Sequence, residues 1–536
     1  MPGIMLISPP SYVGRRHSMP PMGLASIAGE LRAVGHKDIT IIDGYHLAER
    51  GFQYAFDKID EMIKEKKPFI TGITYCTETS EETATICCAA LETGSHIVLG
   101  GHYATVQHEA IAKPLYEMAR EINNSSRTAV ARGEGEKTAK ELFDALYEGK
   151  NLDGIKGVTF YDGKKVVANP DRALADINKL HPPAQDLLLP ISEYGDIYHV
   201  EESRGCVYSC SFCSIHGMYP YARLKSPSRI REEAMRAKEI GAFGINLLGE
   251  LALLDEKRAL EIGDAMKELG MEWGIDAHPS LIRKRKNLIP ILREKGLVYV
   301  ETGVESAVQS SLDVFNKNTT VRKNGNAIKI LKAAGIRPRL DFITFDPYIS
   351  VDELEKNLDF IQNHITEFCN LSDYATYIAQ SWVPTLGTPL LEKATADGLV
   401  KGRKLNPVYR DARVGETLKS YCYFLRNYEE KYNERRERII GAIENDHAES
   451  EISDDRWPLI AALPLGVLYL ARDCAKRGVD ARSRIDSFTT QMFDAVDSGN
   501  SDFPFVKTYK KIVRKIDRRK RSKDKKLAIA PDQSSM

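Results

Sequence analysis

Three cysteines stand close together near the middle of the chain, Cys206, Cys210 and Cys213, with the spacing C-x3-C-x2-C. A four-iron cluster that is held entirely by protein takes four thiolates. Three close thiolates can therefore hold three irons and leave the fourth iron open, as a catalytic zinc site keeps an open position. The pattern predicts a [4Fe–4S] cluster whose open iron binds a substrate or a cofactor.

Two other roles for these cysteines remain open. A structural zinc site needs a fourth ligand, and His216, three residues beyond Cys213, could supply it. The three thiols could instead be buried core side chains. The flanking residues favour the cluster, because Gly205 precedes the first cysteine and Phe212 precedes the last.

The bulk composition is that of a folded protein with several domains. A chain of 536 residues is too long for one hydrophobic core, so we expect about two to four domains. Lys plus Arg equals Asp plus Glu, at 75 each, which gives no overall bias toward nucleic acid. Nine cysteines, an odd and mostly scattered set, do not form a disulfide framework.

These features favour a cytoplasmic protein. A reducing cytosol suits both free thiols and an oxygen-sensitive cluster, and no secretory signal is visible at the N-terminus. The longest apolar run, residues 459–471, contains Pro464 and is too short to cross a bilayer. We expect it to form a buried helix or hairpin.

Strands and helices alternate through residues 1–150, which predicts a doubly wound, Rossmann-like parallel sheet. Ligands of such sheets bind at the carboxyl ends of the strands. Those ends are marked here by polar residues, prolines and glycines: Pro9-Pro10, Asp43-Gly44, residues 74–77, Gly100-Gly101-His102 and Gly133-Glu134.

The rest of the chain divides into four further segments. Residues 151–195 read as a linker that contains a hairpin, and residues 196–400 read as about six βα units with a last strand near 376–380, a partial (β/α)6 barrel. Residues 401–506 are helical, with one long helix over 416–442. Residues 507–536 form a basic helix and a disordered tail.

The cysteine loop, Gly205-Cys206 through Phe212-Cys213, resembles the signature of radical S-adenosylmethionine (radical SAM) enzymes. Ahead of it stand Leu99-Gly100-Gly101-His102, Arg132-Gly133-Glu134-Gly135-Glu136 and Pro182-Pro183-Ala184. In this order the motifs resemble those of cobalamin-binding radical SAM enzymes. The resemblance implies three cofactors: a [4Fe–4S] cluster, S-adenosyl-L-methionine (SAM) and cobalamin. It also implies that the cluster cleaves SAM to a 5′-deoxyadenosyl radical that abstracts hydrogen.

The resemblance also assigns site residues. For SAM these are Phe212 near the adenine, Gly249 and Glu250 at the ammonium, and Glu305 and Ser306 at the ribose or methionyl part. For cobalamin they are Thr74, Tyr75, Gly100, Gly101, His102 and Glu134. Ordinary roles remain open for several of them: Phe212 could plug the cluster, and His102 could be a capping or core histidine. Asp276 and Asp341 could face the barrel lumen or serve structural roles.

One departure concerns the cobalt ligand, since many cobalamin domains use an Asp-x-His-x-x-Gly motif that this chain lacks. In the radical SAM branch the cobalt typically has no histidine below it. Glycines at strand ends suit a bulky corrin, because backbone without a Cβ allows close approach.

The function expected is methylation of an unactivated carbon. The alternatives are a cyclisation or rearrangement without methyl transfer, and a corrinoid- or metal-binding sensor without turnover. The expected partners are a small-molecule or peptide substrate and an electron donor of ferredoxin or flavodoxin type, with no nucleic acid. Residues 507–526 carry twelve Lys and Arg against two Asp, which suits a solvated helix or contact with an anionic surface.

Overall fold

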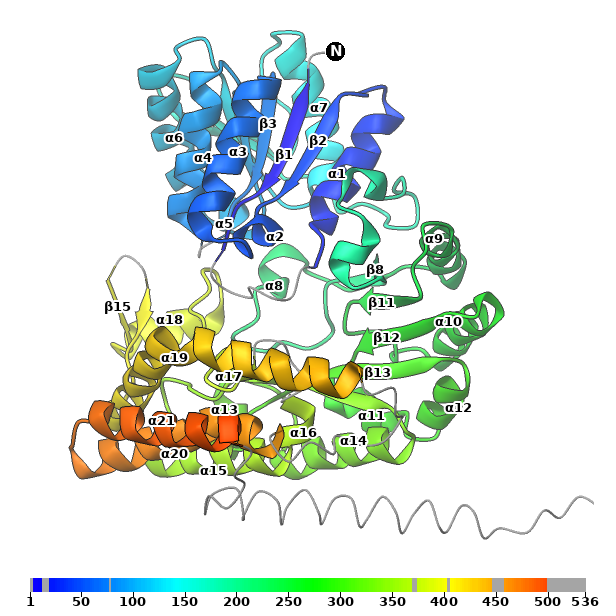
Figure 1. The fold of residues 1–536 in the computed structure, drawn as a ribbon. Helices are drawn as coiled ribbons and strands as arrows, with labels where there is room; N and C mark the ends of the chain where they lie inside the picture. Colours follow the sequence, from blue (N-terminus) through cyan, green and yellow to red (C-terminus); the bar gives the residue numbers. More distant parts are fainter. Residues whose placement is uncertain are drawn as a thin grey trace, which may run out of the picture. The chain divides into compact units, whose positions relative to one another are not determined.

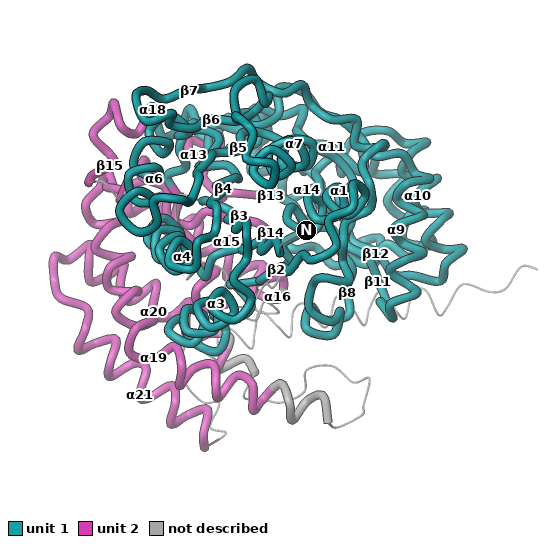
Figure 2. Tube along the Cα trace, turned by 90° about the horizontal axis from the view of Figure 1, so that it is seen from above, with its two compact units in different colours: residues 1–303, 314–339, 384–393 teal, residues 304–313, 340–383, 394–536 magenta. Residues whose placement is uncertain are grey.

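The computed structural model describes residues 3–11, 19–76, 79–368, 374–402, 405–445 and 457–498. They divide into two compact units, shown in Figure 2. The first contains the described residues of 1–303, 314–339 and 384–393. The second contains those of 304–313, 340–383 and 394–536. The predicted basic helix and tail, 507–536, lie outside the described residues.

The first unit begins with a seven-stranded sheet of order β2-β1-β3-β4-β5-β6-β7. Its first five strands are parallel, and their sequences are rich in buried Ile and Val, as expected where both faces of a sheet are covered. The strands are Ile4–Ser8 (β1), Ile39–Asp43 (β2), Ile70–Thr74 (β3), His96–Gly100 (β4) and Thr128–Ala131 (β5).

Helices cover both faces of this sheet, which confirms the doubly wound fold (Figure 1). Alternate residues of β1 enter different cores: Ile4 and Leu6 pack with α1 and α7, whereas Met5 and Ile7 pack with α3, α4 and α6. The helices are α1 (Met22–Ala33), α2 (Gly44–Ala48), α3 (Phe52–Lys66), α4 (Ser80–Glu92), α5 (His102–Val106), α6 (His108–Ile122) and α7 (Gly135–Tyr147).

The hairpin expected in the linker belongs to this sheet. Its strands, β6 (Val158–Tyr161) and β7 (Val166–Ala168), are antiparallel, and β6 pairs with β5. The pairing satisfies the edge of β5 that would otherwise present unpaired backbone groups. The N-terminal sheet therefore extends beyond the predicted boundary at residue 150.

The second sheet has five strands in the order β14-β13-β12-β11-β8, and β8, β11, β12 and β13 are parallel. Tyr198, Val200, Ile245 and Leu247 pack outward with the helices, so the intervening residues face the concave side. The strands are Ile197–Glu201 (β8), Gly244–Leu248 (β11), Glu272–Asp276 (β12), Leu297–Glu305 (β13) and Arg337–Phe342 (β14). The helices between them are α9 (Pro227–Glu239), α10 (Glu256–Leu269), α11 (Pro279–Lys284), α12 (Leu288–Glu294), α13 (Gln309–Val314) and α14 (Val321–Ala333).

The predicted last strand near 376–380 is wrong. Tyr374–Tyr377 is a short helix, α17, and pairing in this region is limited to an isolated bridge between Phe345 and Ser381. The Tyr421 hydroxyl donates to Ala375 O at 2.7 Å, so packing against a long helix overrides the strand propensity of this segment. The sheet therefore has five strands where the alternation predicted six βα units.

The second unit is mainly helical. Its long helix α19 (Ala412–Asn445) confirms the helix predicted over 416–442, and the apolar run around Pro464 lies in α20 (Trp457–Arg477), where Leu463 and Leu465 are buried. In the described part of the chain no helix is both long and apolar enough to cross a membrane. The remaining elements are α15 (Val351–Asn363), α16 (Ile365–Phe368), β15 (Val400–Lys401), β16 (Asn406–Pro407) and α21 (Arg482–Ser498). Helix α18 (Pro389–Ala396) begins in the first unit and ends in the second.

Candidate cofactor-binding site

The cysteine loop begins directly after β9 (Ser203–Arg204), which follows β8, and ends at the short helix α8 (Ile215–Met218). Residues between the cysteines fix it to the rest of the first unit. Ser211 donates from its backbone to Phe315 O at 2.9 Å and from its hydroxyl to Val314 O at 2.7 Å. Asn316 Nδ2 donates to Ser209 O at 2.7 Å. The loop is thus ordered around Cys206, Cys210 and Cys213, which are half-buried free thiols.

Aromatic rings pack on both sides of this loop. The Tyr208 ring stacks on His278 with 3.8 Å between centroids. His278 Nδ1 accepts from Ser280 N, and its Nε2 donates to Lys317 O at 3.0 Å, which fixes the tautomer. Burial, and then the charge of Lys317, lower the pKa of His278 to about 4, so the ring is neutral near pH 7.

Phe212 contacts Phe315 edge to face at 5.4 Å, and the Lys317 ammonium lies 5.8 Å from its ring centre. These contacts support the simpler of the two roles considered for Phe212, a plug beside the cysteine loop. A contact of this ring with the adenine of SAM stays a prediction.

The zinc alternative loses its fourth ligand. His216 Nε2 contacts the carbonyl oxygen of Tyr208. Within the described ranges, no group of three or more His, Cys, Asp or Glu side chains is arranged to hold a single metal ion. A donor set of three thiols on one short loop fits an iron–sulfur cluster, because thiolates are the ordinary ligands of such clusters. Cys206, Cys210 and Cys213 are thus the residues that would hold it.

The loop after β11 packs closely against residues 202–203, which lie just before the cysteine loop. The Glu202 carboxylate is fully buried and accepts from Leu251 N at 3.0 Å, from Ser203 Oγ at 2.7 Å and from Arg258 Nη2 at 2.7 Å. Gly249 has φ +131°, and a Cβ there would collide with Ser203 Oγ and lie 2.9 Å from Glu202 Oε1. Only glycine fits this turn.

This turn brings Glu250 to the cysteine loop. Burial raises the pKa of the Cys206 thiol, and the nearby Glu250 carboxylate adds to the shift. The structure therefore brings Gly249, Glu250 and Cys206 together, the arrangement expected if Glu250 binds the ammonium of a ligand on the cluster's open iron.

Polar side chains line the concave face of the second sheet. Asn246 is the register partner of His199, and Asp276 is the partner of Glu301, which pairs with Arg339 at 3.4 Å. Burial, followed by the charge of Glu301, raises the pKa of Asp276 well above its usual value. Burial, then Arg339, lowers the pKa of His199 to about 4. This face can thus bind a polar group with neutral acceptors and donors.

Three buried atoms of this face lack a hydrogen-bond partner among the described residues: His199 Nδ1, Asn246 Oδ1 and Asp276 Oδ1. Of this set, the sequence singled out Asp276 alone. His199 and Asn246 could also have been predicted from the sequence, because each is a polar residue between apolar neighbours in a strand and therefore faces away from the apolar core. Asp341, the other candidate, accepts from the Tyr377 hydroxyl at 3.2 Å, a structural contact within the second unit.

The carboxyl ends of β3 and β4 bring most of the predicted cobalamin contacts together. Thr74 pairs with Gly100 in register, and Tyr75 N donates to Gly100 O at 2.7 Å. Gly101 has φ +98°, and the next residue, His102, begins α5. A Cβ on Gly100 would meet only Ala131 O, at 3.8 Å, so the missing side chain leaves space at this edge. That space fits a flat macrocycle lying against backbone.

This edge and the cysteine loop are neighbours within the first unit. Helix α5 packs against α8, which follows Cys213 (Figure 1). The first turn of α18 and the residues just before it contact both regions. Leu390 N of α18 donates to Ser211 O at 2.8 Å, and a Cβ on Gly387 would lie 3.4 Å from the Val106 side chain of α5. The strand ends around Gly100-Gly101 and the cysteine loop therefore lie side by side.

Glu134 differs from the expectation. Its carboxylate accepts from Arg223 Nη2 at 2.5 Å, from Ala175 N at 2.6 Å and from Arg204 Nη1 at 3.0 Å. Burial opposes ionisation, but these bonds prevail and hold the pKa of Glu134 below its usual value. The side chain therefore serves the protein's own ion pairs, and a cobalamin contact at this position would fall to the backbone.

Glu305 and Ser306 lie in the second unit and belong to a tight turn after β13. Glu305 has φ +61° and accepts at its carbonyl from Ile343 N at 2.8 Å. Ser306 Oγ donates to Asn357 Oδ1 at 3.0 Å and accepts from Val308 N at 3.1 Å. The hydroxyl is engaged by its own turn, so a SAM contact by Ser306 stays a prediction.

The radical SAM superfamily model matches residues 200–361, which contain the cysteine loop and all of the second sheet except the first residues of β8. An uncharacterized methyltransferase of Pyrococcus horikoshii is 30% identical over 412 residues, covering 74% of this chain and 84% of the relative. An anaerobic magnesium-protoporphyrin IX monomethyl ester cyclase of Rubrivivax gelatinosus is 26% identical over 461 residues, covering 79% of this chain and 78% of the relative.

A solved structure supports the same architecture. The cobalamin-dependent S-adenosylmethionine radical enzyme OxsB, with aqua-cobalamin bound, superposes with a TM-score of 0.64. It covers 99% of this chain and 82% of its own, at 16% identity. The fold found here, a doubly wound domain followed by a partial barrel, is thus the fold of that enzyme.

Proposed function

Because the chain belongs to the cobalamin-dependent family of radical SAM enzymes, we propose that it is a C-methyltransferase acting on an unactivated carbon. One observation carries the proposal: the glycine-edged strand ends of the first sheet and the three-cysteine loop lie side by side in one unit. A corrin bound at the first and a cluster held at the second would share a pocket.

The protein side chains would bind and orient the cofactors and the substrate, and the cofactors would carry out the bond-breaking and bond-forming steps. When bound, the cluster and SAM supply a hydrogen-abstracting radical, and cobalamin carries the methyl group. Cys206, Cys210 and Cys213 would hold the cluster, and Glu250 would fix the SAM ammonium by a charge-assisted hydrogen bond. Asn246, His199 and Asp276 would orient a polar part of the ligand on the concave face of the barrel.

The second candidate, a cyclisation or rearrangement without methyl transfer, is favoured by the likeness to the Rubrivivax cyclase. Methylation has the better support, because the Pyrococcus methyltransferase is more similar and its match covers more of the relative's length. Both candidates use the same cysteine loop and the same glycine edge, so the products must separate them.

Enzymes of this family act on small substrates and need a reductant. We propose that a ferredoxin- or flavodoxin-type protein supplies the electron. A substrate with a polar group fits the His199–Asn246–Asp276 face, since an apolar ligand would leave these buried atoms unpaired.

Product analysis tests the proposal. Anaerobically reconstituted enzyme, given cobalamin, SAM, a reductant and a fractionated extract as substrate source, should form both 5′-deoxyadenosine and S-adenosylhomocysteine. Cys210→Ala should lose iron and deoxyadenosine, whereas Cys422→Ala, at a half-buried cysteine outside the loop, should keep both. Deoxyadenosine without S-adenosylhomocysteine would favour the non-methylating alternative.

A further inference from the structure

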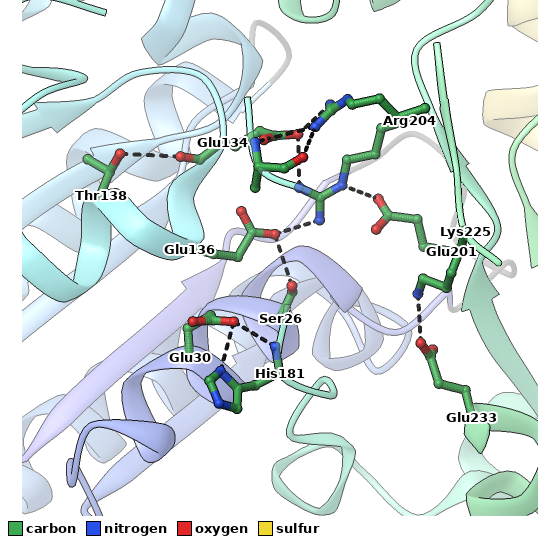
Figure 3. Close-up of polar contacts among 12 residues, drawn as sticks. Ser26, Glu30, Glu134, Glu136, Thr138, His181, Glu201, Arg204, Lys225 and Glu233 are labelled. Carbon is green, nitrogen blue, oxygen red and sulfur yellow. Dashed lines mark hydrogen bonds and ion pairs between the residues drawn. The ribbon is translucent and has the colours of Figure 1, made fainter. Parts of the chain in front are cut away.

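Two sequence motifs that lie far apart in the chain meet in the first unit. Arg204 directly precedes Gly205-Cys206, and its guanidinium bonds the carboxylates of the Glu134-Gly135-Glu136 motif (Figure 3). Arg204 Nη2 lies 2.5 Å from Glu136 Oε1, Nη1 lies 3.0 Å from Glu134 Oε1, and Nε lies 2.8 Å from Glu201 Oε1. One planar guanidinium thus binds three carboxylates, two of them from the cobalamin-binding domain.

The surroundings hold this arrangement in one geometry. Arg223 pairs with Arg204 across the antiparallel ribbon β9–β10 (Arg223–Leu224) and shares the Glu134 carboxylate. Ser26 Oγ donates to Glu136 Oε1 at 2.9 Å. The side chains of Arg204, Glu134 and Glu136 are each only 6% exposed. Burying a charge costs desolvation free energy, so removing any one partner would leave an uncompensated buried charge and destabilise this part of the fold.

Both ends of the network connect directly to a cofactor region. Glu134 is the N-cap residue of α7 and Glu136 lies in its first turn, where the helix dipole favours carboxylates. Gly133, just before them, lies two residues beyond the end of β5. On the other side one residue separates Arg204 from the first cysteine. That residue, Gly205, has φ +79°, and a Cβ there would lie 2.5 Å from Tyr221 O, so the link is a fixed turn.

We propose that Arg204 is a positioning residue that locks the cysteine loop to the strand end of the cobalamin-binding domain through Glu134 and Glu136. Its guanidinium fixes the distance between the cysteine loop and the cobalamin-binding domain, so that hydrogen abstraction and methyl transfer can take place on the same bound substrate. The effect on methyl transfer rests on the proposed function, whereas the mechanical link rests on the contacts alone. Lysine can replace it only in part, because an ammonium keeps the charge but lacks the planar fork that spans three carboxylates.

The test compares Arg204→Gln and Arg204→Lys with Arg231→Gln, an arginine paired with Glu268 at 2.8 Å on the exposed face of α9. Hydrogen exchange measured by mass spectrometry reads the link without catalysis. In Arg204→Gln, amide protection at the start of α7 and in 201–206 should fall roughly 100-fold, since one partner of a buried ion network is lost. Arg231→Gln should leave that protection at the wild-type value.

The second readout is coupling, the methyl groups transferred per deoxyadenosine formed. Arg204→Gln should keep its iron, its cobalamin and its SAM cleavage but lose coupling about tenfold, with Arg204→Lys between it and wild type. If Arg204→Gln does not fold, Glu136→Gln tests the same link with the arginine retained, and a smaller loss in both readouts is expected.

Wild-type protection and coupling in both Arg204→Gln and Glu136→Gln would overturn the proposal, and so would an equal loss in Arg231→Gln. If wild-type enzyme itself transfers no methyl group, the proposed function fails. The exchange comparison still decides the positioning role in that case.

Discussion

Gly249→Ala is the substitution whose effect the structure defines most closely. Gly249 directly follows β11 and has φ +131°, a region that residues with a side chain rarely adopt. An added Cβ would collide with Ser203 Oγ and lie 2.9 Å from Glu202 Oε1. Neither side chain can move away easily. Ser203 Oγ donates a hydrogen bond to Glu202, and the Glu202 carboxylate also accepts from Leu251 N and Arg258.

The magnitude follows from two terms. Backbone strain at such a φ costs about 1–3 kcal/mol. Overpacking of a buried contact adds about 1–3 kcal/mol. The turn that carries Glu250 should therefore lose at least about 2 kcal/mol of preference for its present conformation, which corresponds to roughly 30-fold weaker binding of a ligand that requires it.

The assay is anaerobic isothermal titration of SAM into protein with its cluster reconstituted, with iron content measured on the same sample. Gly249→Ala should bind SAM at least about 30-fold more weakly and keep its iron. The matched control is Gly325→Ala in α14, where an added Cβ has no atom within 4 Å and alanine favours the helix. Wild-type SAM affinity in Gly249→Ala would refute the assignment of this turn.

Three further predictions concern stability. Glu202→Ala leaves Arg258 buried without its carboxylate and should lower the free energy of unfolding by about 3 kcal/mol, measured by urea titration; a loss no larger than that of an exposed glutamate would contradict it. The stability of Asp276→Asn relative to wild type should increase as pH rises above 3.8, because the raised pKa of folded Asp276 makes its ionisation cost wild-type stability; a difference in melting temperature that stays constant with pH would exclude this. His96 has its pKa lowered to about 4 by burial and Arg127, so wild-type stability should fall as pH drops from 6.5 to 4; His96→Gln should flatten that slope, and an unchanged slope would show that His96 is not its source.

The fold could be predicted from local patterns wherever turn-forming or polar residues mark the end of an apolar strand. The five parallel strands of the first sheet are apolar runs that end at Pro, Gly or polar residues. The sequence predicts the hairpin of β6 and β7 and the strand β5, but not the pairing of β6 with β5, because the local sequence of a strand does not specify its partner. Residues Tyr374–Tyr377 favour a strand by their local propensity but form a helix, because they pack against α19. The local sequence does not reveal that contact, since α19 lies farther along the chain.

The candidate site divides in the same way. The three cysteines and the turn at Gly249-Glu250 could be found because each motif is contiguous. The bond between Arg204 and Glu136 joins residues 68 positions apart, and no periodicity or spacing indicates it. The sequence therefore predicts a cobalamin contact for Glu134, and only the structure shows that its carboxylate already binds two arginines.

The most direct test of the central claim, that two cofactors share one site for methyl transfer, needs no substrate. Enzyme loaded with one equivalent of cobalamin and its cluster is reduced and given SAM labelled in the methyl group, and the corrinoid is extracted in the dark for mass spectrometry. We expect close to one labelled methyl group per corrinoid, together with one S-adenosylhomocysteine. An unlabelled corrinoid from enzyme that nonetheless forms deoxyadenosine would contradict it.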